Sequence, residues 1–168
     1  MQFEVGDSVV HPVYGVGHIV KIEEKRFSEK ETRLYYKITL PKRRLWIPIE
    51  THELIGLRLV TAKRDLDQYR NLLRSRPVSL PKNHNKRHLE LASRLKQCSF
   101  QAVCEVVRDL TALSQGKVLG PTDRATLQKS REILYQEWTV AADISRAEAI
   151  EEVEALLSVI QQASVAVN

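Results

Sequence analysis

The sequence RLWIPIETHELIGLRLVTAKRDLDQYRNLLR, residues 44–74, changes its hydrophobic periodicity and thereby decides how the chain folds. Its first half contains the short apolar run 45–49, which is bounded by turn formers and is typical of a β-strand. Its second half places apolar residues at helical spacing instead, at Leu66, Tyr69, Leu72 and Leu73. We therefore predict an α+β protein, with a β domain over residues 1–60 and an all-α domain over residues 61–168.

The part of the chain before residue 44 repeats the strand pattern. Runs of β-branched and aromatic residues occupy 9–11, 18–22 and 34–40. Gly15 and Gly17 predict a tight turn or bulge ahead of the second run, and the polar stretch 27–32 predicts a hairpin tip. Four or five short strands joined by short loops fit a small SH3-like or Tudor-like barrel.

The part after residue 74 continues with helical patterns, giving about five helices in the second domain. Ser99 is a suitable N-cap for a helix beginning at Phe100, and residues 145–148, SRAE, form a capping box for the last helix. Trp138 lies among apolar neighbours of the long helix 122–142, so we expect it to be packed. We expect the same of the thiol of Cys104.

Positive charge is concentrated in residues 70–96, RNLLRSRPVSLPKNHNKRHLELASRLK. This segment carries eight cations against the single acid Glu90: Arg70, Arg74, Arg76, Lys82, Lys86, Arg87, Arg94 and Lys96. The acids of the chain gather elsewhere, notably in residues 143–154. Local charge of one sign is typical of a surface that binds a phosphate backbone, although many charge runs are only solvated helix faces.

The composition limits the class of protein. With 168 residues, 43% of them hydrophobic, and a formal net charge of +5, the chain can form real cores and is moderately basic. Its start lacks a cationic leader followed by an apolar run, and no stretch is apolar enough to cross a membrane. We expect a cytoplasmic protein, not bound to membranes, in which Cys98 and Cys104 are reduced.

Catalytic signatures are missing from the sequence. It contains no phosphate-binding loop, dinucleotide fingerprint, nucleophile elbow or zinc-protease motif. His84 and His88 would share a helix face, but no carboxylate or cysteine stands near them to complete a metal site. We therefore expect a binding module, not an enzyme, with no cofactor and no metal.

Several motifs resemble, in order and spacing, the CarD family of bacterial transcription regulators, also called CdnL. They are FEVGDSVVHPVYGVG at 3–17, WIPIE at 46–50, IGLR at 55–58, LPKNHNKRH at 80–88, CEVVRDL at 104–110 and KSREIL at 129–134. The resemblance implies a non-enzymatic protein. Its Tudor-like domain would dock on the RNA polymerase β subunit, and its helical domain would contact promoter DNA at the upstream edge of the transcription bubble. Open-complex stability would change without sequence-specific DNA recognition.

The resemblance also implies particular contact residues. The polymerase-binding positions fall on Lys25, with Arg26 beside it, and on Arg44 and Trp46. Trp46 fits an interface anchor and the barrel core equally well from the sequence alone.

For DNA, the basic contacts of the family map onto Lys86 and Arg87, and we add Arg76 and Lys82 from charge alone. His84 stands where the family commonly carries a tryptophan that wedges at the fork. Imidazole is smaller and more polar than indole, so fork stabilisation by this residue is expected to be weaker or carried differently.

Two other functions remain open at this point. The chain could be a free-standing, non-specific nucleic-acid-binding protein, which would bind duplex strongly and with steep salt dependence. It could also be an interaction scaffold whose basic surface meets an acidic partner. The leading prediction is a monomer that bridges RNA polymerase and promoter DNA.

Overall fold

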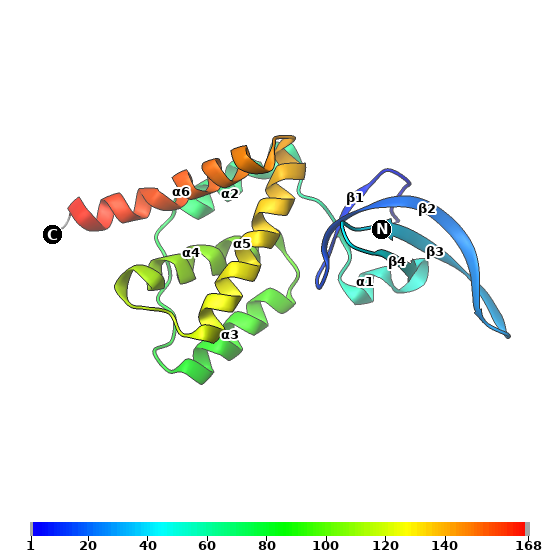
Figure 1. Ribbon diagram of the computed structural model, residues 1–168, viewed down its shortest axis with the longest axis horizontal. Coiled ribbons are helices and arrows are strands. Elements are labelled where there is room, and N and C mark those ends of the chain that lie inside the picture. The colour runs from blue at the N-terminus through cyan, green and yellow to red at the C-terminus, as the bar shows by residue number, and fades with distance from the viewer. Residues whose placement is uncertain (1, 167–168) are drawn as a thin grey trace. The chain divides into compact units, whose positions relative to one another are not determined.

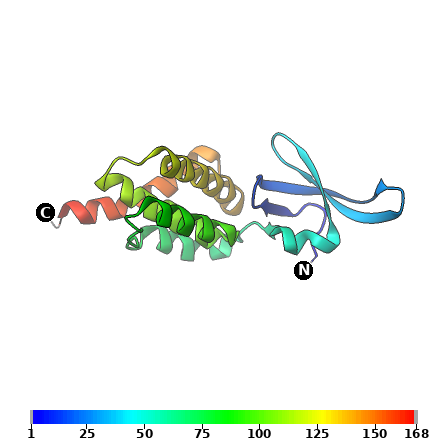
Figure 2. The same ribbon diagram turned by 90° about the horizontal axis from the view of Figure 1, so that it is seen from below.

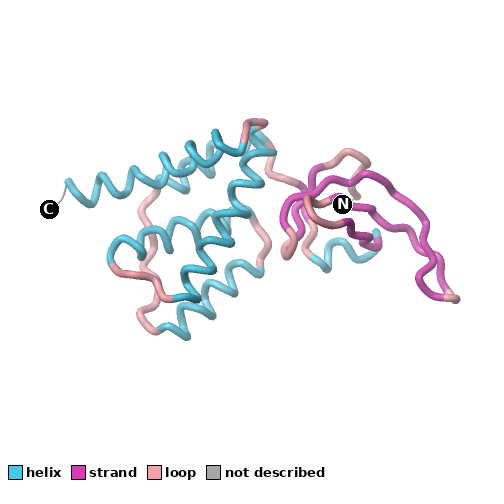
Figure 3. The backbone as a smooth tube through the Cα atoms, viewed as in Figure 1, coloured by secondary structure: helices cyan, strands magenta, loops and turns pink. Residues whose placement is uncertain are grey.

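The computed structural model describes residues 2–166, with side chains through residue 159. It divides into two compact units, residues 1–60 and residues 61–168, and each is described by itself. Figure 3 shows that the described strands all belong to the first unit, while the second contains helices and loops. No helix in the described part of the chain combines the length and apolar character needed to span a bilayer.

The first unit is a five-stranded antiparallel sheet with the order β4-β3-β2-β1-β5, in a Tudor-like fold. The strands are β1 (Ser8–His11), β2 (Gly15–Ser28), β3 (Glu31–Thr39), β4 (Arg44–Pro48) and β5 (Arg58–Leu59). The short helices η1 (Ile49–Thr51) and α1 (His52–Ile55) connect β4 to β5. The predicted fold class is thus confirmed.

The core of the sheet unit forms where apolar side chains of several strands meet. Its buried members are Phe3, Val9, Ile19, Tyr36, Ile38, Leu40, Ile47 and Leu57. Gly17 lies against this core, and a Cβ added there would stand 2.8 Å from Ile38 Cγ2 and 2.9 Å from Leu40 Cδ2. Glycine is therefore required at this position by close approach of the neighbouring strand.

Two local predictions for this unit hold in part. The tight turn ahead of the second run is present at residues 12–14 and ends at Gly15, whose φ is 81°, whereas the register shifts of β2 against β3 fall later, between Ile19 and Lys21 and between Lys25 and Ser28. The hairpin tip lies within residues 27–32 but is shorter than predicted, because β2 continues to Ser28 and β3 begins at Glu31. Main-chain pairing extends the hairpin despite its polar side chains, and the Phe27 and Tyr35 rings, with centroids 5.1 Å apart, support it. Figure 1 shows this long hairpin.

The second unit is a helical bundle that begins with η2 (Lys63–Asp65). Its α-helices are α2 (Leu66–Arg74), α3 (His84–Lys96), α4 (Phe100–Gly116), α5 (Pro121–Ala142) and α6 (Arg146–Ala166). The most buried of them, α4, contacts α2, α3, α5 and α6, and Figure 2 gives a second view of these helices. Trp138 and Cys104 are fully buried, as predicted.

The helix ends follow the local sequence signals. The Ser99 hydroxyl accepts a hydrogen bond from the Ala102 amide, and the Asn83 side chain accepts one from the Lys86 amide at 3.0 Å. The predicted capping box is present: the Glu148 amide donates to the Ser145 hydroxyl, and the Ser145 amide donates to the Glu148 carboxylate. Capping at Asn83 fixes where α3 begins, which matters for the basic segment.

Candidate partner and nucleic-acid interfaces

One face of the sheet brings together three of the four predicted polymerase-binding residues. Arg44 pairs with Thr39, Trp46 pairs with Lys37, and Lys25 pairs with Arg33. Because paired residues share a face and alternate residues along β3 share one too, Arg44, Trp46 and Lys25 project to the same side. We call this side the outer face, since the core residues Tyr36 and Ile38 point the other way.

Trp46 stands at the centre of the outer face. Its indole is partly buried and lies outside the hydrophobic core of the unit. The Nζ atom of Lys25 is 3.6 Å from its ring centroid, and the Nζ atom of Lys37 is 5.6 Å away. The ring is therefore flanked by cations and keeps an exposed part, as an interface anchor would.

Glu23 orients the indole. Trp46 Nε1 donates a hydrogen bond to Glu23 Oε1 at 2.8 Å, and Lys21 Nζ lies 3.1 Å from Glu23 Oε2. The hydrogen bond from Trp46 and then that from Lys21 lower the pKa of the Glu23 carboxyl. The carboxylate thus stays ionised in neutral solution and fixes the ring in one orientation.

Arg26 does not join this group. It follows Lys25 where the strand register shifts, between Lys25 and Ser28, and its guanidinium bonds the main-chain carbonyls of Ser28 and Glu29 at the hairpin turn. The sequence analysis missed Phe27, which is 66% exposed and lies 5.5 Å from the Lys25 ammonium, measured to the ring centroid. Its aromatic side chain, two residues after Lys25, was the signal in the sequence, although the ladder shifts register between Lys25 and Ser28.

More of the positive charge in residues 70–96 is neutralised by acids than the sequence of this segment indicates. Arg70 Nε lies 2.6 Å from Glu152, and Arg94 lies 2.9 Å from Asp109 and 2.7 Å from Glu90. Arg87 lies 2.8 Å from Asp123. The expectation that only Glu90 opposes these cations was wrong, because α4, α5 and α6 supply acids that are distant in sequence. Three of the eight cations are thus neutralised within the fold.

Arg87 requires a correction of its own. Only 4% of the residue is exposed, and its guanidinium also bonds the carbonyls of Pro81 and Lys82, at 3.0 and 3.2 Å. Such a side chain offers no surface to a DNA phosphate, so we remove Arg87 from the predicted contacts. The cost of burying a charge is offset here by an ion pair and by carbonyl acceptors.

The remaining predicted DNA contacts are all exposed and lie close together along the chain. Arg76 and Lys82 belong to the loop between α2 and α3, while His84 and Lys86 belong to the first turn of α3. We call these four residues the basic loop cluster. None of the carboxylates among residues 2–159 lies within ion-pair distance of Arg76, Lys82 or Lys86. Their charge is therefore available to an anionic partner.

The start of the same loop is fixed by α4. The Val78 amide donates to Asp109 Oδ1 at 3.0 Å, and Arg108 Nη1 donates to the Ser75 hydroxyl at 2.8 Å. Asp109 itself is 2% exposed and also binds Arg108 and Arg94. The backbone of the loop is thus held by buried groups while its cations face solvent.

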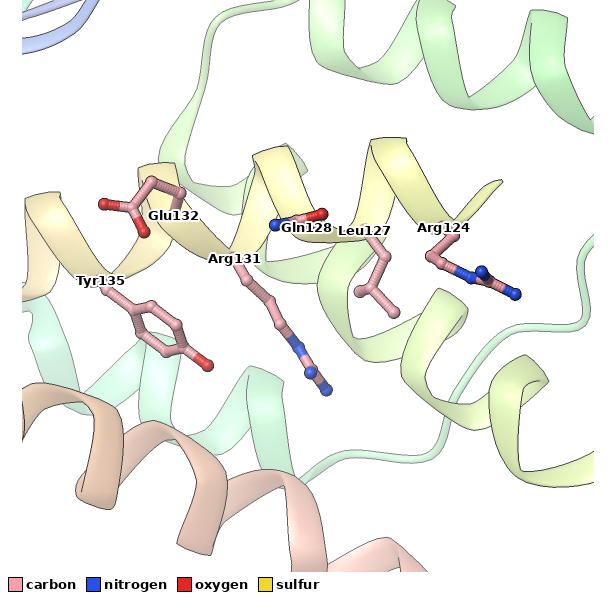
Figure 4. Close-up of a pocket in the computed structure, with 6 residues that line it drawn as sticks. All are labelled: Arg124, Leu127, Gln128, Arg131, Glu132 and Tyr135. Carbon is pink, nitrogen blue, oxygen red and sulfur yellow. The ribbon is translucent and has the colours of Figure 1, made fainter. Parts of the chain in front are cut away.

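A shallow groove of about 320 Å³ lies along α5 and is shown in Figure 4. Its lining residues are Arg124, Leu127, Gln128, Arg131, Glu132 and Tyr135. Several of them hold α6 to α5: Tyr135 donates a hydrogen bond to Glu154, and Arg146 forms a two-pronged ion pair with Glu132. Burial, then the hydrogen bond to Glu154, raises the pKa of the Tyr135 hydroxyl. The groove is accordingly a helix-packing seam.

Residues 2–159 contain no group of three or more His, Cys, Asp or Glu side chains arranged to hold a metal ion. His84 and His88 are both exposed on α3. Cys104 is buried and Cys98 is half-buried.

Comparison with known proteins identifies relatives of both units. Residues 3–60 match the family model of the CarD-like/TRCF RID domain, an RNA polymerase-interacting domain. Residues 68–154 match the model of the C-terminal domain of CarD. The candidate transcription factor YdeB of Bacillus subtilis (strain 168) is 28% identical over 145 residues, which cover 85% of this chain and 94% of that protein. The matches follow one another in the same order as the two units.

Proposed function

Because the chain belongs to the CarD family of transcription regulators, we propose that it binds the β subunit of bacterial RNA polymerase and, at the same time, promoter DNA. The sheet unit grips the polymerase with its outer face. The helical unit lays the basic loop cluster on DNA at the upstream edge of the bubble. The regulator changes the stability of the open complex by contacting DNA shape and phosphates, not base sequence.

The match of residues 3–60 to an RNA polymerase-interacting domain is the observation that carries this proposal. The outer face supplies a suitable contact, because Trp46 is a partly exposed aromatic side chain flanked by Lys25 and Lys37. Tryptophan is among the side chains that contribute most to the binding energy of protein interfaces.

The charges of the second unit favour this tethered role over that of a free-standing nucleic-acid binder. Arg70, Arg87 and Arg94 are engaged within the fold, so fewer cations face a duplex than the sequence indicated. A small cationic cluster suffices when binding to polymerase raises the local concentration of DNA. Affinity of the isolated protein for DNA is then expected to be low.

The experiment measures the lifetime of promoter open complexes formed by purified polymerase with and without the full-length protein. The double substitution Lys82→Glu and Lys86→Glu should abolish the effect on lifetime while leaving co-elution with polymerase intact. Arg64→Glu is a matched control, since Arg64 is an exposed cation of the same unit outside the basic loop cluster. A lifetime effect that survives the double substitution would contradict the DNA contact.

A free-standing binder would behave differently in a second measurement. It would bind duplex DNA tightly without polymerase, and log affinity would fall steeply with log salt concentration. Binding of that kind at moderate salt, combined with failure to bind polymerase, would favour the alternative function.

A further inference from the structure

A buried ion pair fastens the end of the loop that carries Arg76 and Lys82. Arg87 donates through Nε to Asp123 Oδ2 at 2.9 Å, and its Nη2 atom lies 2.8 Å from the same oxygen. The two side chains are 5% and 2% exposed. Asp123 belongs to the first turn of α5, so this contact connects the beginnings of two helices.

The remaining donor of Arg87 reaches the loop itself. Nη1 donates to the carbonyl of Pro81 at 3.0 Å and to that of Lys82 at 3.2 Å. Arg87 therefore holds the main chain of Lys82 from the interior of the fold, while the Lys82 side chain is exposed to solvent. Only a planar, forked side chain can bind a carboxylate on one edge and two carbonyls on the other, so the arrangement is specific to arginine.

Asp123 is what keeps Arg87 in this position. An arginine buried without a carboxylate would turn toward water, because an unpaired charge in the interior is costly. Asp123 lies in the first turn of α5, where the partial positive charge at the amino end of a helix attracts an acidic side chain.

We propose that Asp123 is a positioning residue for the DNA interface: through Arg87 it sets the path of residues 81–83 and thereby where Lys82, His84 and Lys86 meet DNA. The inference rests on the proposed function for its biological meaning, but the positioning can be tested without polymerase. Asp109 performs the corresponding task at the other end of the loop, through the Val78 amide.

The test separates positioning from stability with the double substitution Arg87→Met and Asp123→Leu in the full-length protein. Apolar residues of similar size can replace a buried ion pair with little loss of stability. They cannot bind the carbonyls of Pro81 and Lys82. We expect the melting temperature to stay within a few degrees of that of the parent protein.

Limited proteolysis with trypsin then measures the mobility of the loop, because cleavage after Lys82 requires local unfolding of the surrounding chain. Cleavage between Lys82 and Asn83 should become about tenfold faster, because the charge-assisted bonds that resist local opening are lost. The effect on open-complex lifetime should fall as far as it does in Lys82→Ala. Control substitutions Arg146→Gln and Glu132→Gln remove an ion pair that also joins α5 to another helix and should change neither readout.

The outcomes distinguish the two proposals. In the first outcome, the double variant is cleaved at the rate of the parent protein and has the same effect on open-complex lifetime, while Lys82→Ala loses that effect. This result would overturn the role of Asp123 and would agree with the proposed function. In the second outcome, the double variant is cleaved faster, but no substitution, Lys82→Ala included, changes the open-complex lifetime. This result would support the anchoring of residues 81–83 by Arg87 and Asp123 and would contradict the DNA interface.

Arg87→Lys covers the case in which the double variant does not fold. Lysine keeps the charge beside Asp123 but cannot reach both carbonyls at once. Cleavage after Lys82 should rise to an intermediate rate, and a rate equal to that of the parent protein would overturn the proposal.

Discussion

The outer face of the sheet and the basic loop cluster use charge in opposite ways. On the outer face, Glu23 lies between Lys21 and Lys25 and binds the Trp46 indole, so an acid at the surface partly offsets the cations around an aromatic centre. In the helical unit, Asp109 and Asp123 are buried beneath the loop, where they hold its main chain and leave its cations unopposed. The contrast shows two uses of an acidic side chain. An exposed acid neutralises nearby cations, whereas a buried acid can hold the backbone of a loop whose own cations stay unpaired.

This difference separates the expected binding behaviours. Contact through the aromatic centre of the outer face depends on packing and should respond less to salt. Contact through unopposed cations releases counterions and should weaken as salt rises. The substitutions below alter one side of the comparison at a time.

The largest effect is expected from Trp46→Ala, which removes the centre of the outer face. Loss of an interface anchor should cost about 2 kcal/mol or more of affinity for polymerase. Calorimetric titration of the full-length protein with the β subunit measures it. Leu54→Ala is the control, because Leu54 is 88% exposed on α1 of the same unit. Equal affinities for the two variants would show that the outer face is not the contact.

The substitution His84→Trp tests the basic loop cluster. An indole at the first position of α3 adds stacking area at the fork, worth roughly 1–3 kcal/mol per base. The open complex should therefore last several-fold longer, as measured by competitor challenge. Unchanged polymerase affinity serves as the control. An unchanged or shorter lifetime would mean that His84 does not lie at the fork.

A smaller effect distinguishes two adjacent cations. Lys25→Ala should weaken polymerase binding by about 0.5–1 kcal/mol, the range of an exposed cation–π contact, because Lys25 covers the Trp46 ring. Arg26→Ala should change it less, since the Arg26 guanidinium bonds main-chain carbonyls at the hairpin turn. A larger loss for Arg26→Ala would reverse the assignment of the binding face.

The smallest expected effect is on the free energy of unfolding at acidic pH. Because the hydrogen bond from Trp46 and that from Lys21 hold the pKa of Glu23 below its ordinary value of 4.5, the contribution of Glu23 to stability is present above that value. It is lost as the pH falls through the lower pKa of the folded state. The free energies of urea unfolding of the parent protein and of Glu23→Gln should therefore differ at neutral pH and converge as the pH falls through the lowered pKa of Glu23. A difference that persists in acid would contradict this role of Glu23.

Local signals in the sequence predicted much of the fold. The change of periodicity after Gly56 indicated a sheet followed by helices, and the caps at Ser99 and Ser145 have the predicted geometry. These features depend on residues a few positions apart, so a short window contains the information that specifies them. Burial of Trp138 was predictable for the same reason, from the apolar residues beside it on one helix.

Pairing across the fold was not predictable in this way. The sequence placed eight cations in one segment, but only the tertiary structure brings Asp109, Asp123 and Glu152 to Arg94, Arg87 and Arg70. The tertiary structure likewise separated Lys25, which lies over the Trp46 ring, from Arg26, which bonds carbonyls at the hairpin turn. The sequence by itself determined which elements form and where cations are available. Tertiary structure decided which of those cations remain at the surface, because a charge is neutralised by proximity in space, irrespective of separation along the chain.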